Sequence, residues 1–325
     1  MAYATGTNPA SCSAILQALA TFCTSYGWTV DYNAAYSGTV WALSIHKGSC
    51  YLNFVVPTGD GQIKAYGATG YSSGSAPSAQ ANTNAFAVIT NPGQTSSAVN
   101  PGPYAAYHFF ASSSSTYLHI VIEVTTGVFA HMHAGALNSA GGAAPCIYLA
   151  ASNWYRYNST GGGDSFASSP DGSGNHKPFC SDYANNLGGQ SNTQMYCTVD
   201  GTGRWFAAYN GTSPARLASP GYSGYGNPGW QRAAFLRSPN TFNGVAPMIP
   251  IPFFAERAVG NIYSFVGDAP DIRFVNMKNN NAKDEITIGS DTWKLFPVIS
   301  NSPTINTGGA AASSYPYGLA FLKSA

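Results

Sequence analysis

The most regular pattern in the chain is YLHIVIEVTTGVFAHMHAGAL, residues 117–137. Two apolar runs flank a Thr-Thr-Gly break, which is typical of two antiparallel strands joined by a short turn. Similar runs lie on both sides, YAAYHFFA at 104–111 and APCIYLAAS at 144–152, and Ser or Gly clusters separate them. Residues 104–153 therefore predict an antiparallel meander.

The rest of the chain adds one clear helix and further strands. Residues 11–26, SCSAILQALATFCTSY, place apolar side chains at spacings of three and four behind a serine cap, Ser11 or Ser13, which predicts a helix packed on a sheet. Residues 39–57 read as a hairpin that turns at Gly48, and residues 59–102 as a long, poorly patterned loop. Beyond the meander we expect a hairpin that turns at 200–203, an edge or extended segment, MIPIPFFAERA, and three or four C-terminal strands, with a tight turn at 289–291.

These patterns predict a mainly β chain with a few helices, an α+β fold of antiparallel, sandwich-like sheets with an N-terminal helix packed on a sheet. The segment 157–176 has five glycines and little to bury, so we take it as a linker. The expected organisation is an N-terminal α+β domain at 1–156, the linker at 157–176 and a C-terminal β-rich domain at 177–325.

Charge is scarce in this chain. Asp, Glu, Lys and Arg make up 8% of the 325 residues and the formal net charge is +1, whereas an ordinary domain has ~25% charged residues. Such a chain has little long-range field, which argues against nucleic acid or a membrane surface as its partner. A neutral surface rich in hydroxyl groups and tyrosine suits a subunit packed against other subunits, or one that meets sugars.

Targeting and cysteine usage point to a cytoplasmic origin. The first residues lack the pattern of a signal peptide, and no apolar run reaches the roughly 20 residues of a membrane span. In a reducing compartment the six cysteines are expected to be buried thiols. Oxidation after release from a cell would favour a Cys180–Cys197 or a Cys12–Cys23 pair.

His131 and His133 are the weak candidates for a metal site. Alternate residues of a strand share a face, so the two rings point the same way, and the preceding strand offers His119 and Glu123 on one face. Zinc needs three or four ligands, and the sequence does not show that the two faces coincide. The favoured interpretation is a pair of rings packed in or beside the sheet, with no cofactor.

Catalytic motifs find little support in the sequence. Glu123, in an otherwise apolar strand, is the acid best placed for a raised pKa and general-acid work. The favoured interpretation is an outward-facing residue opposite an apolar face. Neither a nucleophile motif in its strand-to-helix setting nor a phosphate loop is present, so we expect no enzyme activity and no catalytic residues.

Loop aromatic residues are candidates for surface recognition. They lie in or beside Gly-, Asn- and Ser-rich loops, where exposed rings with flexible polar neighbours form contact surfaces. The competing interpretation is that they fill the core or an interface. The residues are Tyr155, Tyr157, Trp205, Tyr209, Tyr222, Tyr225 and Trp230.

Two stretches resemble virion structural proteins of tailed bacteriophages, a group placed among tail or baseplate components. The first is residues 117–142, where a strand leads into Gly127, Phe129 and His131. The second is residues 271–302, continued by YPYGLAFLK at 315–323. It matches the family in a run of residues towards the chain end: Gly289, Asp291, Trp293, Phe296 and Pro297.

The chain departs from those relatives at two positions of the first stretch. Ala130 stands where they often have arginine, and His133 is not part of their pattern. The shared motifs are structural, so the resemblance implies a location in the virion and carries no catalytic residues.

Together these lines predict a non-enzymatic virion protein, made in the host cytoplasm and located in the tail or baseplate. We expect it to assemble with other virion proteins, to form a homo-oligomer and to contact a host surface glycan, without binding nucleic acid or inserting into a membrane. The alternatives are a lectin-like receptor-binding protein, a glycan-degrading tail enzyme and a head decoration protein.

Overall fold

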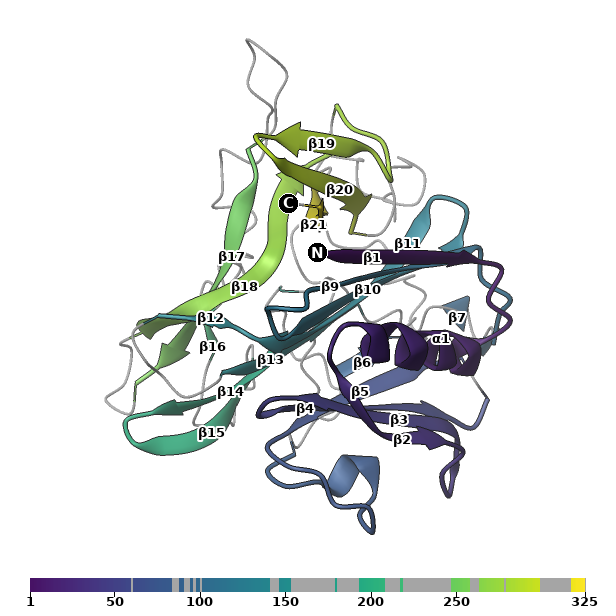
Figure 1. Cartoon of the computed structure of the whole chain (residues 1–325), viewed down its shortest axis with the longest axis vertical. Coiled ribbons are helices and arrows are strands. Elements are labelled where there is room, and N and C mark those ends of the chain that lie inside the picture. The colour runs from purple at the N-terminus through teal and green to yellow at the C-terminus, as the bar shows by residue number, and fades with distance from the viewer. Residues whose placement is uncertain are drawn as a thin grey trace, which may run out of the picture.

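The protein folds into stacked antiparallel sheets with one long helix among the described residues (Figure 1). The computed structural model describes residues 1–59, 61–83, 88–90, 94–95, 98–99, 101–140, 146–152, 179, 193–207, 217–218, 247–257, 263–277, 279–298 and 317–324. Over these residues the chain is mainly β, as expected, and the helical part of the α+β prediction is confined to the N-terminal region.

The central sheet has the order β1-β9-β10-β11-β13-β14-β15. Every neighbouring pair in it is antiparallel. Its strands are β1 (Ala2–Thr7), β9 (Ala106–Ala111), β10 (Tyr117–Thr125), β11 (Val128–Ala136), β13 (Ile147–Ala151), β14 (Thr193–Val199) and β15 (Thr202–Ala207). The predicted meander is thus confirmed as β9, β10, β11 and β13, and the hairpin at 200–203 as β14 and β15.

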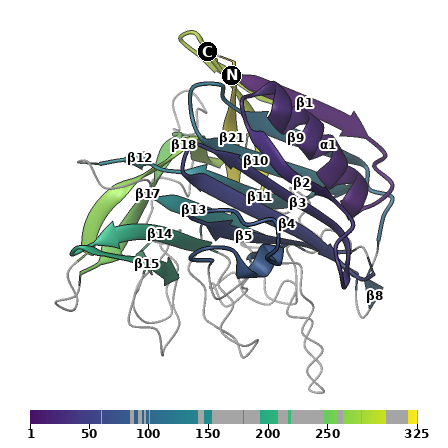
Figure 2. The same ribbon diagram turned by 60° about the horizontal axis from the view of Figure 1, so that its bottom comes forward.

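Two further sheets lie on opposite faces of the central sheet (Figure 1, Figure 2). The N-terminal sheet consists of β2 (Thr29–Ala34), β3 (Thr39–Lys47), β4 (Cys50–Pro57), β5 (Ile63–Ala68) and β6 (Val88–Thr90), in that order. The C-terminal sheet has the order β16 (Leu217–Ala218), β17 (Ile249–Glu256), β18 (Tyr263–Asn276), β21 (Tyr317–Ser324), β20 (Asp291–Pro297) and β19 (Glu285–Ile288), and β12 (Asn138–Ser139) also pairs with β18. The short strands β7 (Gln94–Thr95) and β8 (Ala98–Val99) form a separate pair.

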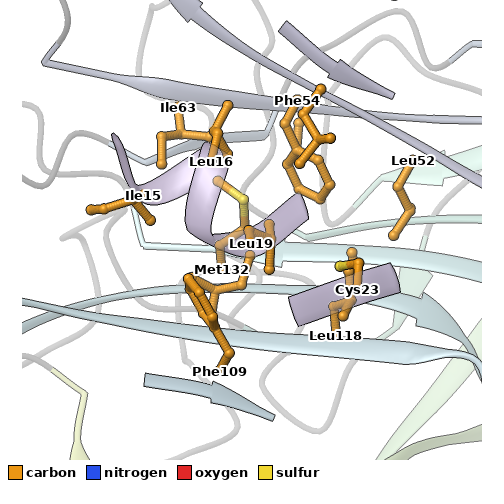
Figure 3. Close-up of a cluster of buried hydrophobic side chains, with 14 of the residues drawn as sticks. Ile15, Leu16, Leu19, Cys23, Leu52, Phe54, Ile63, Phe109, Leu118 and Met132 are labelled. Carbon is orange, nitrogen blue, oxygen red and sulfur yellow. The ribbon is translucent and has the colours of Figure 1, made fainter. Parts of the chain in front are cut away.

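The helix α1 (Cys12–Ser25) follows the predicted pattern closely. The Ser11 hydroxyl accepts a hydrogen bond from the Ala14 amide at 3.3 Å, so Ser11 is the cap. Gly27, with φ +77°, supplies the left-handed residue that lets the chain leave the helix. The apolar face of α1 is buried between the N-terminal sheet and the central sheet, where Leu16, Leu19 and their neighbours meet side chains of both sheets (Figure 3).

Alternation along the central strands divides the interior into two cores. On β10, Leu118, Ile120 and Ile122 belong to the core shared with α1 and the N-terminal sheet. Between them, Val121 belongs to the core shared with the C-terminal sheet. Both faces of the central sheet are therefore covered, which explains the unbroken apolar runs that mark these strands.

Several strands were not expected from the sequence. The predicted loop 59–102 contains β5, β6, β7, β8 and a 3₁₀ turn (Pro77–Ala79), so the loop prediction is wrong there. The strand β5 reads IKAYGA, and its Gly67 is where the ring of Trp205 approaches: a Cβ added to Gly67 would lie 2.6 Å from a ring carbon. The strand β1, AYATGT, consists largely of small residues and pairs with β9 although its sequence shows little apolar alternation. Strands made of small residues that allow close packing lack the large apolar side chains from which a strand is predicted.

The expected linker 157–176 lies outside the described residues. The strands that precede and follow it, β13 and β14, pair directly, with Ile147 opposite Tyr196. β14 and β15 therefore extend the central sheet instead of starting a separate C-terminal sheet. A second connection crosses the layers, because β12 leaves the central sheet and pairs with β18.

Candidate functional site

Four of the six histidines gather on the face of the central sheet that meets the C-terminal sheet. His108 lies on β9, His119 on β10, and His131 and His133 on β11. The register sets His119 opposite His133, with ring centroids 5.3 Å apart, and the centroids of His131 and His133 are 5.6 Å apart. The expectation that His131 and His133 share a face is confirmed, and the face carrying His119 coincides with theirs.

Two of these rings bind the backbone of the C-terminal sheet. His119 Nε2 lies 2.9 Å from the carbonyl oxygen of Pro270, and His131 Nε2 lies 2.9 Å from that of Pro297. Because a carbonyl only accepts, each imidazole must carry its proton on Nε2. The rings therefore act as neutral donors that fasten the central sheet to the C-terminal sheet.

His133 lies among other rings of this layer. It is fully buried, stacks on Phe179 with centroids 5.1 Å apart and lies 5.4 Å from the ring of Phe321. Neither ring nitrogen has a hydrogen-bond partner among the residues that the structure describes. A buried imidazole in such surroundings is stable only in its neutral form.

Burial lowers the pKa of every histidine in the layer. The pKa falls to about 4 for His108, to about 3 for His119 and to about 4 for His131, in each case mainly because burial disfavours the charged ring. The pKa of His133 is lowered well below 6.5 by burial and by the nearby rings of His119 and His131. At neutral pH the whole layer is uncharged.

The metal hypothesis for His131 and His133 gains no third ligand here. Across the described part of the chain, no group of three or more His, Cys, Asp or Glu side chains is placed to hold a metal ion. The Nε2 atoms of His119 and His131 already face carbonyl oxygens. What the arrangement provides is a polar, proton-binding layer inside an aromatic core.

Glu123 is buried, so the expectation that it faces outward is wrong. Its side chain is 4% exposed because the C-terminal sheet covers this face of β10. Both carboxylate oxygens accept from Lys283 Nζ at 3.1 Å, and one also accepts from the Gly127 amide at 3.0 Å. Glu123 thus orders the turn before β11 and ties it to the segment between β18 and β19.

Of the predicted surface aromatic residues, the described part of the chain includes Trp205. Its indole N–H donates to the carbonyl oxygen of Asn82 at 2.7 Å, and its ring packs over Gly67 and beside Tyr196, with centroids 5.5 Å apart. The ring joins β15 to the N-terminal sheet and is only partly exposed. The other six residues, Tyr155, Tyr157, Tyr209, Tyr222, Tyr225 and Trp230, lie outside the described residues.

The five described cysteines, Cys12, Cys23, Cys50, Cys146 and Cys197, are buried thiols, as expected for them. A Cys12–Cys23 disulfide is excluded by the fold, because the two residues lie eleven positions apart in one helix, about 16 Å along its axis. Cys180 lies outside the described residues, so a Cys180–Cys197 bond stays a prediction.

Sequence reasoning missed several members of the layer. Lys283 stands in a polar segment, NNNAKDE, with no periodic signal, and Phe179 follows a Gly- and Ser-rich stretch. His108 could have been found from the sequence, because it lies two residues before Phe110 in one strand, just as His131 lies two residues before His133. The pairing of β9 with β10, which sets His108 opposite Val121, is what brings it into the layer.

No family model matches the chain, and no curated protein matches its sequence. In the described residues, no helix is long and apolar enough to cross a membrane.

Proposed function

We propose that the protein is a structural component of a bacteriophage virion, in the tail or the baseplate. It acts by assembling with other virion proteins and with copies of itself, and through that assembly it takes part in contact with the host surface.

The contact between the two stretches that resemble phage virion proteins carries this proposal. Residues 117–142 form β10, β11 and β12, and the C-terminal stretch forms the end of β18 and all of β19, β20 and β21. Phe129 packs against Phe296 with centroids 5.5 Å apart, and His131 donates to the carbonyl of Pro297. All four of these residues carry the resemblance. The members of each pair are more than 150 positions apart in the sequence, and both pairs meet in one buried core.

A resemblance located in a core supports a shared fold and a structural role. The residues concerned are fastened to one another by ring packing and by hydrogen bonds to backbone. Glu123, the acid singled out for general-acid work, is held by Lys283 and the Gly127 amide. These contacts fit a rigid building block better than a reacting site.

The surface also favours assembly. The chain has 27 charged residues in all, 14 basic and 13 acidic, and two large apolar side chains of the C-terminal sheet are exposed, Phe265 at 47% and Ile288 at 53%. Interfaces between subunits are poor in charge at their centre and rich in aromatic side chains. Such a surface is suited to burial against neighbouring subunits.

The test is to purify particles of the phage that encodes this chain, identify their proteins by mass spectrometry and locate the chain in a map of the particle. We expect it in the tail or baseplate, in a copy number set by the particle symmetry. A chain that accumulates in infected cells and is absent from particles contradicts the proposal. Sustained release of reducing ends from host polysaccharide by the purified protein would instead establish the glycan-degrading alternative.

A further inference from the structure

Cys146 and Cys197 lie opposite each other at one end of the β13–β14 pair. In this antiparallel register Ile147 is opposite Tyr196, so the residue before Ile147 faces the residue after Tyr196. Both cysteines belong to the core between the central and C-terminal sheets, and both are almost completely buried. Strand pairing has thus brought together two thiols that are about 50 residues apart in the sequence.

The two thiols are in contact. Their side chains hydrogen bond to each other, and the Cys146 thiol is also hydrogen bonded to Ser139. Residues that face each other across antiparallel strands have Cβ atoms roughly 4.5–5.5 Å apart, and a disulfide needs about 3.5–4.5 Å. Cys146 immediately precedes β13, so a small shift at the end of that strand brings the sulfurs to bonding distance.

The surroundings make the two thiols unequal. Hydrogen bonds from Cys197 and Ser139 favour the thiolate of Cys146 and lower the pKa of that thiol against the effect of burial. The pKa of Cys197 is raised by its hydrogen bond to Cys146 and by burial. Cys146 also lies just outside β13, at the end of its strand, so we assign it as the attacking thiol and Cys197 as the resolving thiol.

We propose that Cys146 and Cys197 form an oxidation-dependent intramolecular disulfide that locks β14 to the base of the β12 crossover. With oxidised glutathione as the oxidant, the Cys146 thiolate attacks one sulfur, the glutathione S–S bond breaks and one reduced glutathione leaves. Cys197 then loses its proton, attacks the Cys146 sulfur of the mixed disulfide and releases the second reduced glutathione. The protein loses two electrons and two protons, and the glutathione disulfide gains them.

The position of the bond defines its effect. After β11 the short strand β12 pairs with β18 (Figure 1), and the Leu137 amide donates to the carbonyl oxygen of Cys146 at 2.8 Å, so Leu137 and Cys146 form the base of this crossover. The disulfide joins this base covalently to β14 and closes a loop of about 50 residues. The bond forms in any sufficiently oxidising medium, whatever the role of the protein.

The experiment compares the full-length protein after incubation with oxidised glutathione and after reduction with dithiothreitol, at a temperature well below unfolding. Because both thiols are buried, reaction needs local opening and is followed over hours. Free thiols are alkylated, and linked peptides are identified by mass spectrometry. We expect Cys146–Cys197 as the main linked pair and a melting temperature about 5 °C or more above that of the reduced protein, reversed by dithiothreitol.

Two variants separate the bond from general effects of oxidation. Cys197→Ala should abolish both the linked peptide and the shift in melting temperature, whereas Cys50→Ala, at a buried cysteine of the N-terminal sheet, should keep both. If Cys197→Ala does not fold, the peptide map of the native protein decides alone. A Cys180–Cys197 bond, bonds between chains, or unreacted Cys146 and Cys197 in the folded protein would overturn the proposal.

Discussion

The two faces of the central sheet have the same strands and similar burial but opposite chemistry. The face toward α1 carries mainly aliphatic side chains, such as Leu118, Ile120 and Met132 (Figure 3). The face toward the C-terminal sheet carries four histidines, a buried glutamate and a set of phenylalanine rings. The first face is held mainly by burial of apolar surface, and the second also depends on the protonation states and hydrogen bonds of buried side chains. Stability should therefore respond to pH on one side of the sheet and not on the other.

The largest expected effect is on the apolar side. Leu19→Ala removes a fully buried side chain between α1 and the two sheets and should lower the free energy of unfolding by about 3 kcal/mol. Denaturant titration at pH 7.5 and at pH 5.5 measures this loss, which should be the same at both values. Gln17→Ala, on the exposed side of the same helix, is the matched control and should change the free energy by less than about 0.5 kcal/mol.

The histidine side should lose stability in acid. The pKa values of His108, His119, His131 and His133 are lowered in the fold, so the unfolded chain binds protons first. The stabilisation by neutral rings is complete above the unfolded value of 6.5 and is lost as the pH falls below it. Each ring contributes a slope of up to about 1.4 kcal/mol per pH unit.

His133→Phe tests the origin of that slope. The variant fills an aromatic site with a ring that does not titrate, so its free energy of unfolding should fall less steeply between pH 6.5 and 5, by about 1.4 kcal/mol per unit. Working above pH 5 keeps Glu285 out of the measurement. Hydrogen bonds from Lys294 and Lys323 lower the pKa of Glu285 from 4.5, so its contribution is lost only in stronger acid. An unchanged slope in the variant would show that the layer does not govern acid stability.

On the histidine side, Glu123 joins the central sheet to the segment between β18 and β19 by charge. Glu123→Gln keeps the size of the side chain but loses the ion pair with Lys283, and the free energy of unfolding should fall by about 2 kcal/mol. A double-mutant cycle with Lys283→Met measures the coupling between the two side chains. Glu285→Gln breaks ion pairs with Lys294 and Lys323 at a carboxylate whose side chain is 36% exposed, and it should cost less than about 1 kcal/mol. Equal losses in the two glutamine variants would mean that burial adds nothing to the Glu123 pair.

The smallest effect concerns Lys47, which ties the N-terminal sheet to the central sheet. Its ammonium group donates to the carbonyl oxygens of Ser112, Ser113 and Ser115 at 2.7–2.9 Å and to that of Tyr26 at 3.3 Å. The side chain is partly exposed and its hydrogen bonds are open to solvent in part, so Lys47→Met should cost about 1 kcal/mol, measured by denaturant titration. Lys64→Met on β5 serves as the comparison, with an expected change within about 0.5 kcal/mol. A larger loss for Lys64→Met than for Lys47→Met would contradict this account.

The parts of the fold that were predicted correctly are those with a regular apolar pattern. The strands β9, β10, β11 and β13 have clear apolar runs and the helix α1 has apolar residues at spacings of three and four, with caps or turn residues at the ends, so local chemistry was sufficient to predict them. β1 and β5 were missed because their small residues serve close approach to a neighbour, such as Trp205 over Gly67. The two-residue period of a strand predicted that His131 and His133 share a face. It did not predict the burial of Glu123, which depends on the C-terminal sheet that covers that face.

Local patterns in the sequence were enough to predict that the chain is mainly β, that α1 packs on a sheet, and that His131 and His133 point the same way. These features depend on side-chain period and on capping, which are local. Only the tertiary structure decided that both faces of the central sheet are covered, that Lys283 pairs with Glu123, and that Cys146 faces Cys197. Such facts depend on which distant strands pair and stack, and a local pattern contains no information about its partner.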